Sequence, residues 1–422
     1  MSDGERHNRQ IVESAEFDVA GLDASRTAAD ARRHPAALHE IARRRLMAGN
    51  AAGAHEILQE AVRHDPGDVD AWLNLAAALR GLQRVNDEMA AIDKALEIEP
   101  RNLRALLQRA SLHEIQGLPR AAAATYRTAL QIIPRGAEPP PSIQPVLLHA
   151  KRAVEANDLA LENFLEDRLK HLRRQFADQP LARFDQCLAT LLRKHRIYRQ
   201  QPTFMYFPHL PSIEFYERSD FPWLDSIEAA ADDIRAELVN LLADGPAVLD
   251  PYVAMPKGVP VDQWRELNYS RRWGVYYLWR EGTAIAEHIA RFPRTVAALN
   301  AWPRCEVPGC GPTAVFSILD ANTRIPPHTG VTNTRLIVHL PLIVPPGCGF
   351  RVGARQREWQ PGKAFVFDDT IEHEAWNNSN VPRAVLILDI WSPYLTQAER
   401  EMVSSATAAV GEYYGVGSYR GV

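Results

Sequence analysis

The chain has 422 residues, and at roughly 150 residues per domain this length predicts two or three domains. Hydrophobic residues make up 46% and charged residues 24% of the sequence, which argues against bulk disorder. The formal net charge of −4 gives no strong field for nucleic acid or a membrane surface, and four cysteines are too few for a disulfide framework. We expect a cytoplasmic protein, because the polar start shows no secretory signal and no apolar run approaches the roughly 20 residues of a membrane helix.

After an N-terminal segment, residues 1–34, for which we expect flexibility, the first clear feature is a repeat. Pro66, Pro100 and Pro134 are spaced 34 residues apart. Aligned on these prolines, small and apolar residues fall into columns: Leu38, Trp72 and Leu106; Ala42, Ala76 and Ala110; Ala61, Ala95 and Ala129. Period and pattern resemble the tetratricopeptide repeat over residues 35–136. The repeats could form a concave peptide-binding surface or only a helical spacer.

Residues 137–200 read as a linker followed by capping helices. Four prolines fall between Ala137 and Pro145, which predicts a linker or a sharp turn. Apolar residues then recur at steps of three or four, which predicts helices over about 146–176 and 182–198. These helices are expected to close the repeat stack and join it to the next domain.

A second domain is predicted over residues 201–398, with a C-terminal tail at 399–422 to which we assign no role. Helical patterns cover about 222–243 and 284–302. Short runs rich in Val, Ile, Leu and Phe then alternate with turn residues, at 313–319, 335–344, 349–352, 364–368 and 383–391. The predicted fold class is therefore α + β and multidomain: an all-α solenoid, then a double-stranded β-helix of the jelly-roll, cupin-like type with flanking helices.

Three residues in this second domain carry the chemistry. His328 and His373 lie at edges of predicted strands, and Arg383 opens the last strand. Two imidazoles on a rigid sheet are a natural start for a non-haem Fe(II) site, and a deeper arginine suits the far carboxylate of 2-oxoglutarate. A lone histidine beside a strand is more often structural, so the argument depends on the ordered set.

The ordered set resembles the aspartyl/asparaginyl β-hydroxylase family. The stretches that carry the resemblance are Phe316–Leu319, His328–Asn333, Arg335, His339–Leu340, Phe367–Asp369, Glu372–Glu374 and Trp376. Members of that family are Fe(II)- and 2-oxoglutarate-dependent dioxygenases on a double-stranded β-helix. The resemblance implies iron ligands at His328 and His373, Ser317 and Arg383 on the distal carboxylate of 2-oxoglutarate, and His339 near its other end.

The third coordination position departs from the wider superfamily. Many relatives read His-x-Asp at the first ligand, whereas this sequence has Gly330 where the Asp would stand. The family resembled here shares that glycine, which implies two histidines and a water. Asp369 remains either a further ligand or, as we prefer, a group that orients His373 through a hydrogen bond.

The substrate is the point at which the resemblance weakens. Animal members have a second arginine two residues after the position of Arg335, and this chain has Ile337 there. Arg335 could bind an acidic substrate alone, or it could be a strand-edge surface residue. The leading interpretation is an enzyme that uses Fe(II), 2-oxoglutarate and O₂ to hydroxylate the β-carbon of Asp or Asn in a peptide or protein presented by the repeats.

Two alternatives stay open. One is the same chemistry on a small-molecule or lipid substrate, with the repeats as a docking module. The other is a non-catalytic repeat scaffold with a degenerate cupin domain. In all three cases we expect neither nucleic acid nor membrane as a partner.

Overall fold

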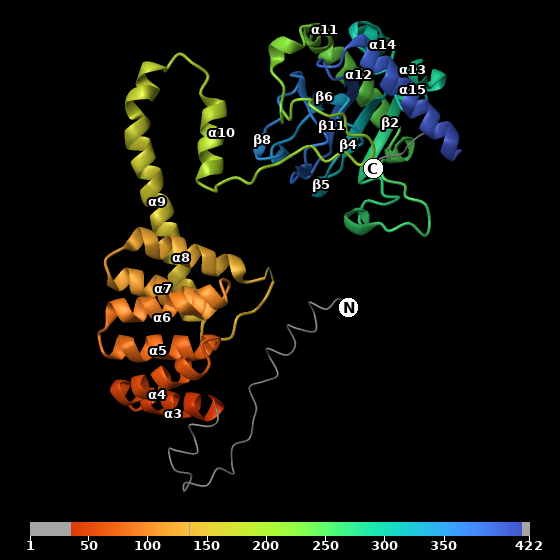
Figure 1. Cartoon of the computed structure of the whole chain (residues 1–422). Coiled ribbons are helices and arrows are strands. Elements are labelled where there is room, and N and C mark those ends of the chain that lie inside the picture. Colours follow the sequence, from red (N-terminus) through yellow and green to blue (C-terminus); the bar gives the residue numbers. More distant parts are fainter. Residues whose placement is uncertain (1–34, 135, 416–422) are drawn as a thin grey trace. The chain divides into compact units, whose positions relative to one another are not determined.

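The computed structural model of the chain describes residues 35–134 and 136–415 (Figure 1). The N-terminal segment expected to be flexible lies outside these residues. Contacts within the chain divide it into two compact units, residues 1–181 and 182–422. The sequence predicts a domain boundary near residue 200. In the structure the boundary comes earlier, and helix α10 (Ala182–Leu191) already belongs to the second unit.

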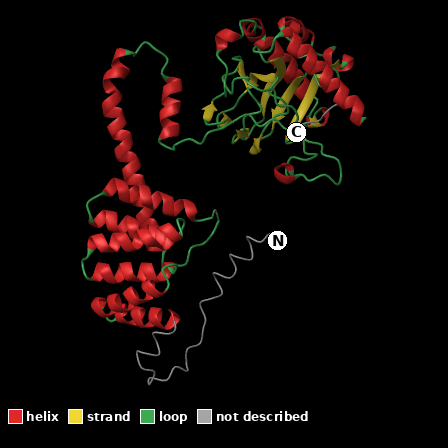
Figure 2. Cartoon of the chain, viewed as in Figure 1, coloured by secondary structure: helices red, strands yellow, loops and turns green. Residues whose placement is uncertain are grey.

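The first unit is a stack of antiparallel helix pairs (Figures 1 and 2). The six paired helices are α3 (Pro35–Met47), α4 (Ala51–His64), α5 (Val69–Gly81), α6 (Val85–Ile98), α7 (Leu103–Ile115) and α8 (Pro119–Ile132). The alanines of the repeat columns are buried where the helices cross, because only a small side chain allows such close approach. The predicted repeat architecture is confirmed.

The turns inside the helix pairs need a left-handed residue. Gly49 and Gly117 have φ of 76° and 70° in the first and third repeats. Gln83 occupies the same turn of the middle repeat with φ of 56°. Glycine adopts this conformation without steric cost, whereas a glutamine does not.

Helix α9 (Gln144–Gln175) follows the last repeat and packs against α8 through Leu147 and Ala150, which are buried. Arg127 of α8 also donates two hydrogen bonds to the Asp158 carboxylate, at 3.1 and 2.5 Å. The start of α9 therefore closes the stack, as a capping helix should.

The second unit contains two antiparallel sheets. The larger has the strand order β1-β2-β4-β11-β6-β9, with β3 also paired to β2, and the smaller has the order β5-β10-β7-β8. Their bounds are β1 Asp250–Pro251, β2 Trp273–Arg280, β3 Thr283–Ala284, β4 Ala314–Leu319, β5 Thr323–His328, β6 Arg335–Ile343, β7 Cys348–Val352, β8 Arg355–Arg357, β9 Phe365–Phe367, β10 His373–Asn377 and β11 Arg383–Trp391. This is the expected double-sheet domain.

The period of two along the central strands sends each side chain to one of two faces. On β6, Leu336, Val338 and Leu340 point outward into a core shared with helix α12 (Ala231–Leu242). Arg335, Ile337 and His339 alternate with them and line the cavity between the sheets. The same alternation on β4 and β11 gives the cavity its polar residues.

The helices of the second unit differ from the sequence-based expectation in detail. The predicted helix at 222–243 is divided at Ala230 into α11 (Leu224–Ala229) and α12. The predicted helix at 284–302 is two short helices, α13 (Ala286–Ile289) and α14 (Pro293–Ala298), because Pro293 starts a new helix rather than continuing one.

The C-terminal tail contains helix α15 (Gln397–Tyr414). Thr396 caps it, and the Thr396 and Glu399 side chains form a reciprocal capping box. Across residues 35–134 and 136–415, no helix combines the length and apolar character that crossing a membrane requires.

Candidate active site

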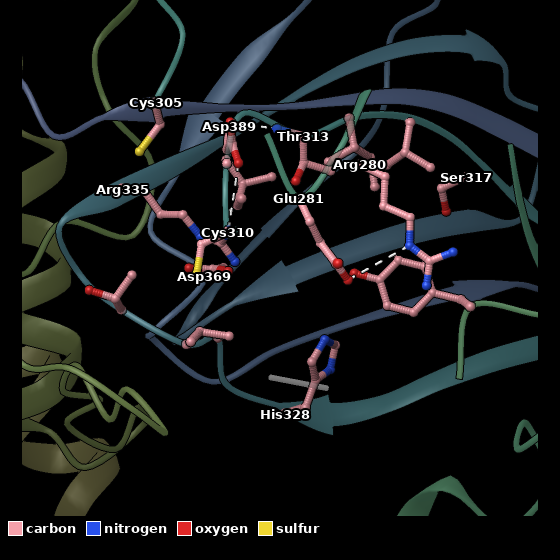
Figure 3. Close-up of a pocket in the computed structure, with 18 of the residues that line it drawn as sticks. Arg280, Glu281, Cys305, Cys310, Thr313, Ser317, His328, Arg335, Asp369 and Asp389 are labelled. Atoms are coloured by element: carbon pink, nitrogen blue, oxygen red, sulfur yellow. Dashed lines mark hydrogen bonds and ion pairs between the residues drawn. The ribbon is translucent and has the colours of Figure 1, made fainter. Parts of the chain in front are cut away.

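A cavity of about 590 Å³ lies in the second unit, lined by residues from both sheets (Figure 3). All seven site residues expected from the sequence line it: Ser317, His328, Arg335, His339, Asp369, His373 and Arg383. In Figure 3 the His328 imidazole projects into the pocket from one side, while Arg335 and Asp389 lie together at another.

The two histidines lie side by side on adjacent strands of the small sheet. Strands β5 and β10 pair in antiparallel register with His328 directly opposite His373. Their ring centroids are 4.0 Å apart and the ring planes are inclined at 49°. Two residues 45 positions apart in the sequence therefore meet because of strand register.

The backbone fixes the tautomer of both rings. His328 Nδ1 lies 2.8 Å from the Pro326 carbonyl oxygen, and His373 Nδ1 lies 3.2 Å from that of Ile371. A carbonyl oxygen can only accept, so each Nδ1 carries the proton and each neutral ring keeps its lone pair on Nε2.

Burial keeps both imidazoles uncharged. It lowers the pKa of His328 to about 4, and it lowers the pKa of His373 well below the ordinary value, with the neighbouring His328 adding to the effect. Neutral rings with free Nε2 lone pairs are the form in which histidine binds a metal ion.

The Asp369 carboxyl group lies beside Gly330, the position at which many relatives have the Asp of a His-x-Asp motif. A Cβ added to Gly330 would lie 2.1 Å from Asp369 Oδ2, so the Asp369 side chain already fills this space. Asp369 Oδ1 is buried with no hydrogen-bond partner among the described residues, and burial raises the pKa of the group to about 7. The Asp369 carboxyl group thus lies against the loop of His328. The hydrogen bond to His373 that the sequence led us to prefer stays a prediction.

Arg383 is almost fully buried in the pocket, at 1% exposure. Its guanidinium lies 4.5 Å above the Trp359 ring, Nη1 is 3.5 Å from the Ser317 carbonyl oxygen, and Nε has no hydrogen-bond partner in the described part of the chain. Ser317 Oγ accepts a hydrogen bond of 3.0 Å from Trp273 Nε1. A buried guanidinium held this way is prepared for an anion.

His339 lies on β6 between this arginine and the aromatic core. Its ring centroid is 4.9 Å from that of Phe367 and 5.1 Å from that of Phe350. Burial, assisted by the charge of Arg383, lowers its pKa well below the ordinary value, so His339 is neutral. It completes the polar wall on the Arg383 side of the cavity.

Arg335 belongs to an internal charge cluster. Its Nη1 lies 3.6 Å from Asp389 Oδ2, and Asp369 is close enough to raise the pKa of the guanidinium (Figure 3). Burial raises the pKa of Asp389 to about 6, and Arg335 opposes that rise. Arg335 is thus half-buried beside two carboxyl groups, not a free surface residue.

The donor set fits a metal ion with open positions. In the part of the chain that the structure describes, no group of three or more His, Cys, Asp or Glu side chains is placed to hold one. Two neighbouring neutral imidazoles would supply two ligands and would leave the other coordination positions to water and to a chelating ligand. Arg383, whose Nε has no hydrogen-bond partner among the described residues, would be available to a carboxylate of that ligand.

Three contributing residues were not predicted from the sequence. Trp359 supports Arg383, while Gln200 and Asn333 hydrogen-bond to each other at 3.1 Å behind the histidine loops. Asn333 lies within the stretch His328–Asn333 that carries the family resemblance, so the sequence did indicate its importance. Gln200 and Trp359 act only through the tertiary fold, and neither had a local signal.

Two families match different parts of the chain. Residues 228–393 match the family described as aspartyl/asparaginyl beta-hydroxylase, and residues 45–109 match the tetratricopeptide repeat. The hydroxylase family match lies within the second unit, and the repeat match lies within the first.

Two curated relatives are named for different activities. The human aspartyl/asparaginyl beta-hydroxylase is 34% identical over 185 residues, 42% of this chain and 24% of the human protein. The ornithine lipid ester-linked acyl 2-hydroxylase of Rhizobium tropici is 34% identical over 189 residues, 43% of this chain and 62% of that protein. The matches thus span less than two thirds of either relative.

A solved structure resembles the helical part of the chain. The Yersinia enterocolitica type III secretion chaperone SycD, in complex with a peptide of the translocator YopD, is 17% identical and has a TM-score of 0.27. The match covers 29% of this chain and 91% of that one.

Proposed function

We propose that the second unit is an Fe(II)- and 2-oxoglutarate-dependent dioxygenase that hydroxylates an unactivated carbon. One observation carries the proposal: two neutral imidazoles lie side by side in a pocket that also holds a fully buried arginine, Arg383, with no carboxylate partner among the described residues. A hydroxylase of this domain family needs a place for both a metal and an anionic co-substrate, and this pocket offers both.

The residues divide between these two tasks. His328 and His373 would hold the metal through Nε2, with Asp369 beside the loop of the first ligand. Arg383 would bind the distal carboxylate of 2-oxoglutarate, with Ser317 as a hydroxyl partner and His339 on the neighbouring wall. Bound iron would supply the oxidation, in which O₂ and 2-oxoglutarate yield succinate, CO₂ and a hydroxylated substrate.

The protein's own contribution is position and exclusion of water. Trp359 holds the Arg383 guanidinium flat, and the aromatic residues around His339 keep that end of the cavity dry. A fixed cation in a dry site binds a carboxylate more strongly than the same group does in water.

For the substrate we propose the β-carbon of Asp or Asn in a peptide or protein, with the repeats as the partner-binding module. The family match supports this choice, and Arg335 is the pocket cation that would face an acidic side chain. The expected cytoplasmic location rests on composition and stays a prediction.

A specific observation favours a second candidate, the same reaction on a small molecule or a lipid acyl chain. Ile337 lines the pocket on β6, and Arg335 is already beside Asp389 and Asp369. An apolar side chain next to a balanced cation suits hydrocarbon better than a carboxylate. The relative named as an ornithine lipid ester-linked acyl 2-hydroxylase also supports this candidate.

Two experiments test the proposal. Anaerobic addition of Fe(II) and 2-oxoglutarate to the full chain should give a weak visible charge-transfer band that His328→Ala abolishes, while His195→Ala, at an exposed position, retains it. A band retained by His328→Ala would refute the ligand assignment. The absence of a band in the wild type would favour a non-catalytic scaffold.

The second experiment is a succinate-release screen with mass spectrometry. A gain of one oxygen on Asp or Asn of a peptide supports the leading substrate. Turnover restricted to metabolites or acyl lipids supports the second candidate and rejects the first.

A further inference from the structure

A segment distant in sequence lies across both histidine loops. We call residues 200–207 the strap. Gln201 N donates to the Thr370 carbonyl oxygen at 2.7 Å, just before His373. Thr203 N and Phe204 N donate to the carbonyl oxygens of Gly330 and Val331, both at 3.0 Å and just after His328. The strap therefore joins two loops that belong to different strands.

The Gln200 side chain sits where the two loops meet. Its Nε2 donates to Asp368 Oδ2 at 2.6 Å and to the Pro211 carbonyl oxygen at 3.2 Å, while its Oε1 accepts from Asn333 Nδ2 at 3.1 Å. Asp368 and Asn333 are both buried, at 0% and 1% exposure. One amide thus connects a buried acceptor before His373 to a buried donor after His328.

Both partners make further hydrogen bonds, Asp368 within its own loop and Asn333 to the strap. Asp368 Oδ1 accepts from the backbone N and the Oγ1 of Thr370, at 2.9 and 2.6 Å, which closes the turn that leads into His373. Asn333 Oδ1 accepts from Phe207 N at 2.7 Å, and its Nδ2 also donates to the Phe207 carbonyl oxygen at 2.9 Å.

The hydrogen bonds between strands β5 and β10 are irregular beside the two histidines. The pairing of β5 with β10 shifts register between His373 and Ala375, so the ladder is irregular beside the opposed histidines. Additional contacts are needed there to keep the two rings at a fixed separation.

We propose that Gln200 is a positioning residue that fixes His328 and His373 relative to each other by acting through Asp368 and Asn333. This inference rests on the proposed function, because it assumes that the two histidines hold a metal. Gln200 touches neither ring. Its role depends on having both a donor and an acceptor, which an amide provides and a carboxylate does not.

The test uses Co(II) as the probe, titrated anaerobically into the full chain and followed by its visible absorption. Gln200→Glu keeps the shape of the side chain but places a second carboxylate against Asp368. We expect the Co(II) dissociation constant to rise roughly tenfold, the low end for losing a supporting partner of a metal ligand, with a changed visible band. The matched control is Gln201→Glu, because the exposed Gln201 is held through its backbone N.

A reversal of the hydrogen bond provides the rescue. Adding Asp368→Asn to Gln200→Glu exchanges donor and acceptor, so the affinity for Co(II) should return toward that of the wild type. Binding of 2-oxoglutarate at saturating Co(II) should not change in any of these variants, since Trp359 and Trp273 hold Arg383 and Ser317. Gln200→Met, which removes both hydrogen bonds without adding charge, is the second variant if Gln200→Glu does not fold.

The outcomes separate this inference from the proposed function. Wild-type Co(II) affinity in Gln200→Glu or Gln200→Met overturns the positioning role. The positioning role is also overturned if the Gln200 variants lose Co(II) and 2-oxoglutarate affinity equally, melt at a lower temperature and are not rescued by Asp368→Asn. That result would mean that Gln200 only stabilises the fold. Failure of the wild type to bind Co(II), or full binding by His328→Ala, overturns the proposed function instead.

Discussion

At the scale of a single residue, burying the Arg383 guanidinium costs the free protein stability. A fully buried cation loses its hydration, and burial accordingly lowers the pKa of this guanidinium to about 10. The Trp359 ring and one backbone carbonyl offset only part of that cost. An anionic ligand would supply the missing partner, so the site gives up some stability of the free protein for affinity.

Replacing Arg383 with methionine should therefore separate binding from stability. Arg383→Met keeps volume and removes the charge, so we expect the free protein to melt at an unchanged or higher temperature. Affinity for 2-oxoglutarate should fall by about 3 kcal/mol, or roughly a hundredfold. Thermal melting with and without 2-oxoglutarate measures both, with exposed Arg355→Met as the control. A variant that still gains melting temperature from the ligand would show that Arg383 does not bind it.

The buried titratable groups of the pocket have opposite effects on stability. The unfolded chain protonates its histidines near pH 6.5, whereas folded His328 does so only near pH 4, so this contribution is lost as pH falls through that window. Burial raises the pKa of Asp369 and Asp389 to about 7 and about 6. Their contribution therefore grows as pH falls from 7 toward the ordinary carboxyl range.

Metal affinity should reveal these shifts more clearly than stability does. Two histidines with ordinary pKa values would lose roughly a hundredfold in Co(II) affinity between pH 7.5 and pH 5.5 through competition with protons. Because His328 and His373 stay neutral in this range, we expect a much smaller change, measured by titration at both pH values. We attribute the remaining pH dependence of Co(II) affinity to Asp369, and it should disappear in Asp369→Asn. A hundredfold loss in that variant would contradict the depressed pKa values.

At the scale of elements, sequence patterns predicted what is locally encoded. The Val- and Ile-rich strands β4, β6 and β11 were predicted, because long apolar runs identify central strands. Strands β2, β5 and β10 were not predicted, and the last two carry the two histidines. Pro326 and Pro327 break the strand pattern of β5, and β10 is short and rich in polar residues.

The candidate site divides in the same way. His328, His373 and Arg383 were predicted from an ordered motif, and the structure places all three in the lining of one pocket. The strap at residues 200–207 could not be, since its contacts with residues 330–333 and 368–371 depend on the tertiary fold. Gln200 carries no local signal that distinguishes it from its exposed neighbour Gln201.

The repeat turns give a prediction for the first unit. Gln83 adopts the left-handed conformation that Gly49 and Gly117 adopt in the other repeats. Gln83→Gly should increase the free energy of unfolding by about 1 kcal/mol, because it removes the steric cost of a Cβ there. Urea unfolding measures it, and the reciprocal Gly117→Gln should destabilise by a similar amount. A loss of stability in Gln83→Gly would mean that the glutamine side chain makes a compensating contact.

At the scale of the whole molecule, the chain is built from two units with separate cores. The cluster around Ala54, Leu58 and Ala76 belongs to the repeats, and the cluster around Phe316, Leu340 and Leu386 belongs to the sheets and their helices. Each of these clusters lies entirely within one unit. Folding of one unit should therefore not require the other.

This independence gives a direct test of what the repeats do. A fragment of residues 182–422 should fold cooperatively by circular dichroism, bind Co(II) and 2-oxoglutarate like the full chain, and release succinate at the same substrate-independent rate. If the repeats present a protein substrate, the fragment's KM for that protein should rise at least about tenfold, while its KM for a short peptide or small substrate stays unchanged. Equal KM values for the protein substrate would reduce the repeats to a spacer, and a fragment that binds no Co(II) would show that the first unit is needed to complete the site.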